Sequence, residues 1–328
     1  MIVSKTPLRI SFFSGGSDMP SFYEKETGAA LSVTINQFIY VCVHKTPNLG
    51  VKIMYDQIEE VSDIERMQHL ITKEALKYFD INKEITVASI SDIVSKGSGL
   101  GSSSAFTVGL VNALGTLKYG KTLPDYNATV ACDIEMLRCN YPIGKQDQYA
   151  AAFGGFNLIE FYSDDRVDVR PVEIKAETLK RLNDNLLLVY SGKGRSANSI
   201  LQKQKEAMSD KDKFNLVKRS RDKAYSAYKL LEKDNTDDFG SLLHEAWMDK
   251  KSVVKEITQT YFDDIYDKAL KSGCLGGKLL GAGGGGFFLF YVPREKRAEA
   301  VKNITDNTEC KIFNFNFYGR GSEIITYD

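Results

Sequence analysis

Two carboxylates near the middle of the chain, Glu135 and Asp147, are of a type that binds metal ions or moves protons. Ala128, Ala131 and Cys132 precede Glu135 at offsets of seven, four and three, so a helix would place them on its face. A carboxylate on a closely packed face needs a partner, and a divalent cation is one. A solvated helical Glu is the alternative.

Asp147 lies in the polar run Gly144–Gln148, which leads into a small apolar helix ended by glycines. Lys145, two residues earlier, could hold this carboxylate ionised or contact a phosphate. Taken alone, Asp147 is more typical of a helix N-cap. Asp18 follows the turn Ser14–Ser17 and is a turn residue by default, or an acceptor for sugar hydroxyls if the turn lines a site.

The stretch Gly97–Ala105 has the composition and position of a phosphate-binding loop. It lies between a predicted strand over 84–90 and a predicted amphipathic helix beginning near Ser102. Its glycines allow backbone amides to face an anion, and the helix adds unpaired N–H groups and the positive end of its dipole. The serine hydroxyls can cap the helix, bind phosphate oxygens or ligate Mg²⁺. A serine-capped loop is the alternative, but the order strand, glycines, helix favours a triphosphate.

Two other glycine-rich stretches fail the context that their patterns require. Gly115–Thr122 has Walker A spacing, yet it follows a helical pattern and precedes Pro124, so Gly120 is interpreted as a helix C-terminal cap. Gly281–Gly286 contains a dinucleotide-binding pattern but is followed by a strand. Its glycines, Gly283 and Gly284 among them, indicate either a tight turn or a close approach of the backbone to a ligand.

Composition excludes several classes of protein. The 328 residues are 43% hydrophobic and 26% charged, which is typical of a globular chain of one large or two moderate domains. Lys+Arg and Asp+Glu are both 43, so nothing indicates nucleic acid or an anionic membrane as a partner. The five cysteines are scattered and odd in number, which is typical of free thiols in a reducing cytosol. We therefore expect a cytoplasmic protein without a membrane span.

The elements that must position these residues alternate between strands and helices, which predicts an α+β fold. Strands are expected over 8–12, 29–35, 38–44, 156–161, 186–190, 287–292 and 311–317. Helices are expected over 63–79, from 124 to about 139, and over 196–233. A soft boundary near residue 185 predicts two domains, 1–185 and 186–328.

Three motifs in this order resemble those of the GHMP kinases. Thr6–Asp18 resembles the family's first motif, Gly97–Ala105 its second, ATP-binding motif, and Lys278–Phe287 its third. Finer features resemble the branch that acts on D-glycero-D-manno-heptose 7-phosphate; they are Pro7–Phe12, Gly144–Tyr149, and His244–Trp247 with Lys250 and Lys251. One departure is Ser14, which stands where a third glycine is expected and adds a hydroxyl beside the sugar site.

The resemblance implies ATP and Mg²⁺ as cofactors and a small-molecule sugar phosphate as substrate. It also implies an N-terminal domain of the ribosomal-S5 type and a ferredoxin-like C-terminal domain, with the site between them. By family likeness Asp147 is the general base, Arg9 steadies the transferring phosphoryl group, and Ser103 and Glu135 are metal ligands. The nucleotide site takes in the whole loop: Gly97, Ser98, Gly99, Leu100, Gly101, Ser102, Ser103 and Ser104. The expected substrate-binding residues are Gly15, Gly16, Asp18, Lys145, Arg195, Gly283 and Gly284.

A substrate that already bears a phosphate needs a second anion site, and Ser191–Asn198 is the candidate because it carries Lys193, Arg195 and flexible glycines before a helix. A capped helix with solvated cations is the alternative. Two rival functions stay open: a GHMP kinase acting on a free sugar such as fucose or galactose, and a catalytically silent sugar or nucleotide sensor. A homodimer also stays open, as do the anomer and the pathway.

Overall fold

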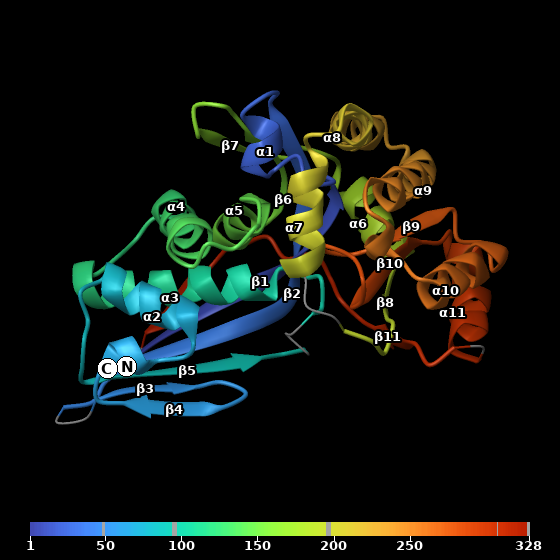
Figure 1. The fold of residues 1–328 in the computed structure, drawn as a ribbon. Helices are drawn as coiled ribbons and strands as arrows, with labels where there is room; N and C mark the ends of the chain where they lie inside the picture. Colours follow the sequence, from blue (N-terminus) through green and yellow to red (C-terminus); the bar gives the residue numbers. More distant parts are fainter. Residues whose placement is uncertain (48–49, 94–96, 195–197, 307, 327–328) are drawn as a thin grey trace.

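Two β-sheets with helices packed on them form the frame of the molecule (Figure 1). The computed structural model describes residues 1–47, 50–93, 97–194, 198–306 and 308–326. Its strands are β1 (Ile2–Phe13), β2 (Gly28–Lys45), β3 (Val51–Met54), β4 (Ile58–Val61), β5 (Ile85–Ser91), β6 (Phe156–Phe161), β7 (Val167–Pro171), β8 (Leu186–Tyr190), β9 (Gly276–Leu279), β10 (Phe287–Tyr291), β11 (Lys311–Phe313) and β12 (Glu323–Thr326). Its α-helices are α1 (Pro20–Tyr23), α2 (Leu70–Tyr78), α3 (Ser102–Tyr119), α4 (Pro124–Cys132), α5 (Gln146–Phe153), α6 (Ala176–Asn185), α7 (Asn198–Ala207), α8 (Lys211–Glu232), α9 (Thr236–Val253), α10 (Thr260–Lys271) and α11 (Arg297–Asp306).

The first sheet is organised around β2, which pairs with β1 on one side and with β6 and then β5 on the other. Sequence predicted two strands here, and the structure has one. Asn36 and Gln37 have no partner on β1, where the register shifts between Pro7 and Leu8. This bulge bends the strand and interrupts the sequence pattern without ending the pairing. Helices α3 and α5 pack on β1 and β2, and α4 packs over them.

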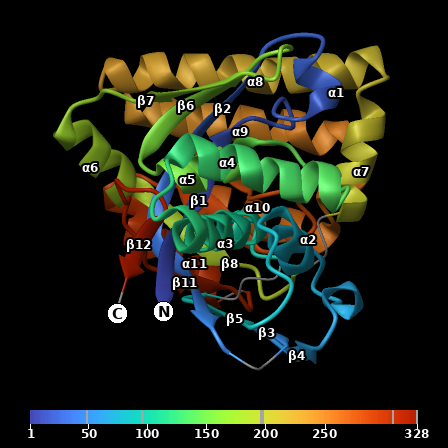
Figure 2. The same ribbon diagram turned by 90° about the vertical axis from the view of Figure 1, so that its left-hand side faces the viewer.

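The second sheet has the strand order β11-β8-β10-β9, with every neighbouring pair antiparallel. Counted along the chain from β8, this order is 4-1-3-2, and helices separate β8 from β9 and β10 from β11. That is the βαββαβ arrangement of a ferredoxin-like fold, with extra helices in the first connection. The chain then returns to the first sheet, where β12 pairs with β1 (β12 is labelled in Figure 2). The boundary near residue 185 stays a prediction.

Three predicted elements are shorter or more broken than their patterns suggest. The helix expected over 63–79 is a 3₁₀ turn, η1 (Ile64–Arg66), followed by α2, because His69 accepts a hydrogen bond from the Thr72 amide and starts a new helix. The helix expected over 196–233 is α7 and α8, since Asp210 caps the second of them. The last strand, expected over 311–317, ends at Phe313.

The helices α8 and α9 run side by side and join the two sheets (Figure 2). Helix α8 packs on β1 and β2, while α9 packs on β9 and β10. The single tryptophan, Trp247 of α9, is fully buried against Phe288 and Tyr266. Within the described ranges, no helix is both long and apolar enough to cross a bilayer.

Candidate active site

A cavity of about 620 Å³ opens between the two sheets, within the size range of small-ligand sites. Segments that are remote in sequence line it: the end of β1 and the turn after it, the start of α3, the segment before α5, and residues from α9 and from the third glycine motif. Of the predicted site residues, the lining includes Arg9, Gly15, Gly16, Asp18, Gly97, Ser98, Gly99, Gly101, Ser102, Ser103, Ser104, Glu135 and Asp147.

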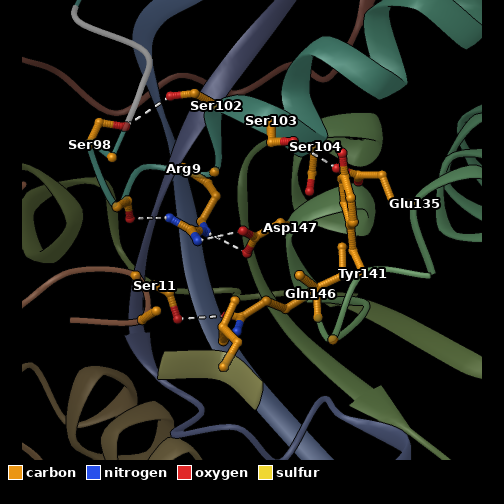
Figure 3. A pocket seen from close by; sticks show the side chains of 18 of the residues that line it. Arg9, Ser11, Ser98, Ser102, Ser103, Ser104, Glu135, Tyr141, Gln146 and Asp147 are labelled. Atoms are coloured by element: carbon orange, nitrogen blue, oxygen red, sulfur yellow. Dashed lines mark hydrogen bonds and ion pairs between the residues drawn. The ribbon is translucent and has the colours of Figure 1, made fainter. Parts of the chain in front are cut away.

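Arg9 and Asp147 form a bidentate ion pair at the centre of this cavity (Figure 3). The Arg9 Nε and Nη2 atoms donate to Asp147 Oδ1 and Oδ2 at 2.8 and 2.7 Å, and Nη1 donates to the Gly99 carbonyl at 2.7 Å. The arginine is 4% exposed, so the pair is held in a place where few waters compete. Asp147 lies in the first turn of α5 and is not the residue that caps it, which is Lys145.

The loop before α3 has the backbone shape of an anion-binding turn. Gly97, Gly99 and Gly101 all have positive φ, and Gly101 is the N-cap of α3. Among the described residues no side chain caps this helix, so its first amides are left for a ligand. A serine hydroxyl does bind the loop before the helix, because Ser98 Oγ accepts from the Leu100 amide at 3.3 Å. Leu100 differs from its neighbours because its side chain is buried in the core and its carbonyl accepts from the Arg9 amide at 3.1 Å.

Glu135 is fully buried in η2 (Asp133–Arg138), a π-helical turn that continues α4. Its carboxylate accepts from Ser103 Oγ at 2.9 Å and from Gln148 Nε2 at 2.6 Å. Burial raises the pKa of Glu135 to about 7, against hydrogen bonds from Ser104, Gln148 and Ser103 that lower it. No cationic side chain pairs with it in the described part of the chain, where no three His, Cys, Asp or Glu side chains gather as a metal site either.

Asp18 closes the end of the cavity next to the turn after β1. Its side chain accepts from Ser14 Oγ at 3.2 Å and from the Gln146 amide at 3.3 Å, so the extra hydroxyl of Ser14 does lie at this end. Burial, together with the nearby Asp147 charge, raises the pKa of Asp18. Ser11 donates to Gln146 at 2.7 Å beside it. These oxygens and amides are suited to binding hydroxyl groups.

Three of the predicted substrate-binding residues do not line the cavity. Lys145 turns away, because its ammonium pairs with Asp165 Oδ1 at 2.6 Å and lies over the Tyr23 ring. Gly283 and Gly284 do not line the cavity, since they pack against the backbone of Ile257. These two glycines therefore permit a close approach to the backbone of the protein and not to a ligand. Arg195 lies outside the described residues.

Sequence reasoning missed two lysines that line the cavity, Lys250 of α9 and Lys278 of β9. Both lie inside segments that resemble the family's motifs. The spacing of residues in those segments does not indicate that α9 and β9 lie next to the first motif. Sequence reasoning also missed an aromatic group that lines the cavity. There Tyr55, His69 and Phe106 are in ring contact, with centroids 4.7 and 5.3 Å apart.

Comparison with protein families finds two matching models that together cover about half of the chain. The model of the GHMP kinases N terminal domain matches residues 65–155, and the model of the GHMP kinases C terminal domain matches residues 227–308. These ranges contain the α3 loop, Glu135, Asp147 and Lys250.

Among characterised proteins, the chain is 30% identical to D-glycero-alpha-D-manno-heptose 7-phosphate kinase of Campylobacter jejuni, covering 92% of this chain and 93% of that one. It is 25% identical to the bifunctional fucokinase/GDP-fucose pyrophosphorylase of Arabidopsis thaliana, but spans only 32% of that protein. Among solved structures, a D-glycero-D-manno-heptose 1-phosphate kinase from Bacteroides thetaiotaomicron superposes with a TM-score of 0.81 at 25% identity over 100% of both chains.

The backbone of the second motif packs closely against the third motif at Gly99, and Gly99→Ala tests whether this contact requires a glycine. A Cβ at Gly99 would lie 2.6 Å from the Leu280 carbonyl, whereas one at Gly120 would meet nothing within 4 Å. Both glycines have positive φ, so alanine is strained by about 1–2 kcal/mol at either position. We expect Gly99→Ala to lower the free energy of unfolding, measured by urea titration, by about 1–3 kcal/mol more than Gly120→Ala does. Equal losses in the two variants would contradict this close approach.

Proposed function

The chain belongs to the GHMP kinase family, and from this premise we propose that it transfers the γ-phosphoryl group of ATP to the anomeric hydroxyl of D-glycero-D-manno-heptose 7-phosphate, forming the 1,7-bisphosphate. Membership confirms the resemblance seen in the three motifs and the two-domain α+β fold. It also identifies the protein as an ATP-dependent phosphotransferase with a sugar hydroxyl as acceptor. The particular sugar is the proposal.

The observation that carries the proposal is the Arg9–Asp147 pair, which lies between a phosphate-binding loop and a group of hydroxyl-binding side chains. The loop Gly97–Ser104 would bind the phosphates of ATP through its backbone amides and the start of α3. Asp18, Gly15 and Gly16 would bind the sugar at the opposite side of the pair. An acceptor hydroxyl is thereby directed at the terminal phosphorus.

In the proposed reaction, the oxygen of the anomeric hydroxyl forms a bond to the γ-phosphorus, the bond from that phosphorus to the bridging oxygen breaks, and ADP leaves with the electron pair. Asp147 accepts the hydroxyl proton. Both of its oxygens are held by Arg9, so the carboxylate keeps one orientation as the proton moves. Arg9 also has N–H groups beyond the three used in its described hydrogen bonds, and these offset charge on the transferring group.

The donor set around Glu135 fits Mg²⁺, which accepts carboxylate and hydroxyl oxygens. Glu135 is a fully buried carboxylate with no cationic partner in the described structure, and Ser103 is hydrogen-bonded to it. These two residues would hold the ion together with nucleotide phosphates. When bound, Mg²⁺ neutralises phosphate charge and orients the triphosphate.

The choice of a heptose phosphate is supported by the Campylobacter jejuni relative, which matches over nearly its whole length. For the acceptor's own phosphate we propose the segment Ser191–Asn198, in which Arg195 stays a sequence prediction. Its last residue, Asn198, begins α7 and lines the cavity with Leu201 and Gln204. A free sugar of the fucose type is the second candidate, because two fucokinase-containing relatives match at 25% and 24% identity.

The acceptor is identified by ³¹P NMR of the protein with MgATP and three sugars in parallel: D-glycero-D-manno-heptose 7-phosphate, fucose and galactose. We expect a new sugar-phosphate signal and release of ADP with the heptose phosphate only. A signal with fucose or galactose alone would replace the proposed acceptor by the second candidate. ADP release with none of the sugars tried, despite ATP binding, would favour the sensor.

The role of Asp147 is tested with Asp147→Asn, which keeps the size of the side chain and removes the base. We expect kcat to fall by about 10²–10⁴-fold while the affinity for ATP changes little. Asp165→Asn serves as the control, because that carboxylate pairs with Lys145 outside the cavity. Near-normal turnover in Asp147→Asn would remove Asp147 from the reaction.

A further inference from the structure

Lys250 and Lys278 are buried lysines without a carboxylate partner among the described residues. Lys250 is 8% exposed and Lys278 is 6% exposed, and both line the cavity. Buried charges are normally paired, because removing an ion from water is unfavourable. Two unpaired ammonium groups facing one cavity therefore indicate an anion that the ligand brings.

The hydrogen bonds of Lys250 fix its ammonium against the phosphate-binding loop. Its Nζ donates to the Leu279 carbonyl at 3.3 Å and to the Gly281 carbonyl at 2.5 Å. Gly281 in turn packs on Gly99, where a Cβ on Gly281 would lie 2.6 Å from the Gly99 Cα. An ammonium has three N–H groups, so at least one is left for a ligand in the cavity.

Arg9 contacts Gly99 of the loop directly. Its Nη1 donates to the Gly99 carbonyl, and its remaining partner is Asp147, the proposed base. Lys250 and Arg9 are close enough that the charge of Arg9 disfavours the ammonium form of Lys250. Burial is the larger cause, and together they lower the pKa of Lys250 to about 7.

Lys278 has a different position, facing the strand that carries Arg9. Its Nζ donates to the Phe12 carbonyl of β1 at 2.7 Å. Burial, followed by the charges of Lys250 and Arg9, lowers the pKa of Lys278 well below its usual value. Three basic side chains thus gather at one place, and within the described part of the chain only Arg9 has a carboxylate partner there. The groups that face Lys250 are Arg9 on β1 and Lys278 on β9, with Asp147 beyond Arg9 on α5.

We propose that Lys250 is a further catalytic residue, whose ammonium binds the γ-phosphoryl oxygens of ATP opposite the Arg9 guanidinium. The ammonium offsets negative charge on the oxygens of this group while it is transferred to the acceptor hydroxyl. The inference rests on the proposed phosphoryl transfer and names the residue that recognises the third phosphate. Lys250 forms no covalent bond to the transferred group.

Binding of a triphosphate would change the protonation of Lys250. In the free protein at about pH 8, a group with a pKa of about 7 is mostly uncharged. An adjacent phosphoryl group favours the ammonium form and raises the pKa, so binding of a triphosphate takes up a proton. A diphosphate, which does not reach Lys250, takes up less.

The test compares a non-hydrolysable ATP analogue with ADP by isothermal titration calorimetry, in the presence of Mg²⁺ and in two buffers of different ionisation enthalpy. For the unmodified protein at about pH 8 we expect proton uptake with the analogue to exceed that with ADP by a large part of one proton. Equal uptake with the two nucleotides would overturn the proposal without any variant being made.

The variant Lys250→Met removes the charge and keeps the length of the side chain. We expect its affinity for the analogue to fall by about 10- to 100-fold, its affinity for ADP to stay within about threefold, and the extra proton uptake to vanish. Lys250→Gln, which retains N–H donors for the Gly281 carbonyl, keeps the test valid if Lys250→Met fails to fold. Lys251→Met is the matched control, since that neighbouring lysine pairs with Asp263 at 3.2 Å and does not line the cavity.

Three outcomes with Lys250→Met also overturn the proposal. They are equal weakening of the analogue and ADP, unchanged binding of both, and weakened binding of the sugar phosphate with the analogue unaffected, which would assign Lys250 to the acceptor. The proposed function is tested by separate results. It fails if the ³¹P NMR screen shows no transfer to the heptose phosphate, or if neither nucleotide binds the unmodified protein.

Discussion

The buried guanidinium of Arg9 is the contact on which the site depends. Three of its N–H groups hold the Asp147 carboxylate and the Gly99 carbonyl, and so join β1, the loop before α3 and the start of α5. Arg9 and Asp147 are 138 residues apart in the sequence, yet direct hydrogen bonds hold them together. A planar fork with fixed donor directions can do this, whereas a lysine at the same place could not. The third glycine motif then closes on Gly99 from the other side.

The charges around this arginine explain why the cavity is suited to a metal-bound polyanion. Arg9, Lys250 and Lys278 line the cavity, and so does Glu135, which is buried without a cationic partner among the residues described. Burial moves the pKa of Glu135 up and that of Lys250 down, each toward its neutral form. A nucleotide triphosphate with Mg²⁺ supplies negative charge to the lysines and positive charge to the carboxylate. Such a ligand would satisfy groups that the free protein holds in low-dielectric positions.

Much of this arrangement could be predicted from the sequence, because short motifs carry their own local geometry. The glycines of Gly97–Ser104 and the helix that follows are adjacent in the chain, and their pattern was enough to predict the loop. Contacts between residues far apart in the sequence are harder to predict. The motif predicts Lys145 in the substrate site, but its ammonium pairs with Asp165, which lies between β6 and β7. Lys250 was missed because its position depends on how α9 packs between the sheets, which no local spacing encodes. The bulge at Asn36 and Gln37 likewise made one strand resemble two.

The central claim is that the loop before α3, the Arg9–Asp147 pair and Glu135 surround one nucleotide. Diffraction from crystals grown with a non-hydrolysable ATP analogue and Mn²⁺ tests this most directly, since anomalous scattering locates the metal independently of the protein. The claim predicts the phosphates on the amides of Gly97–Ser104, the metal between Ser103 and Glu135, and the terminal phosphoryl group next to Arg9. A nucleotide bound elsewhere, or a metal remote from Glu135, would contradict it.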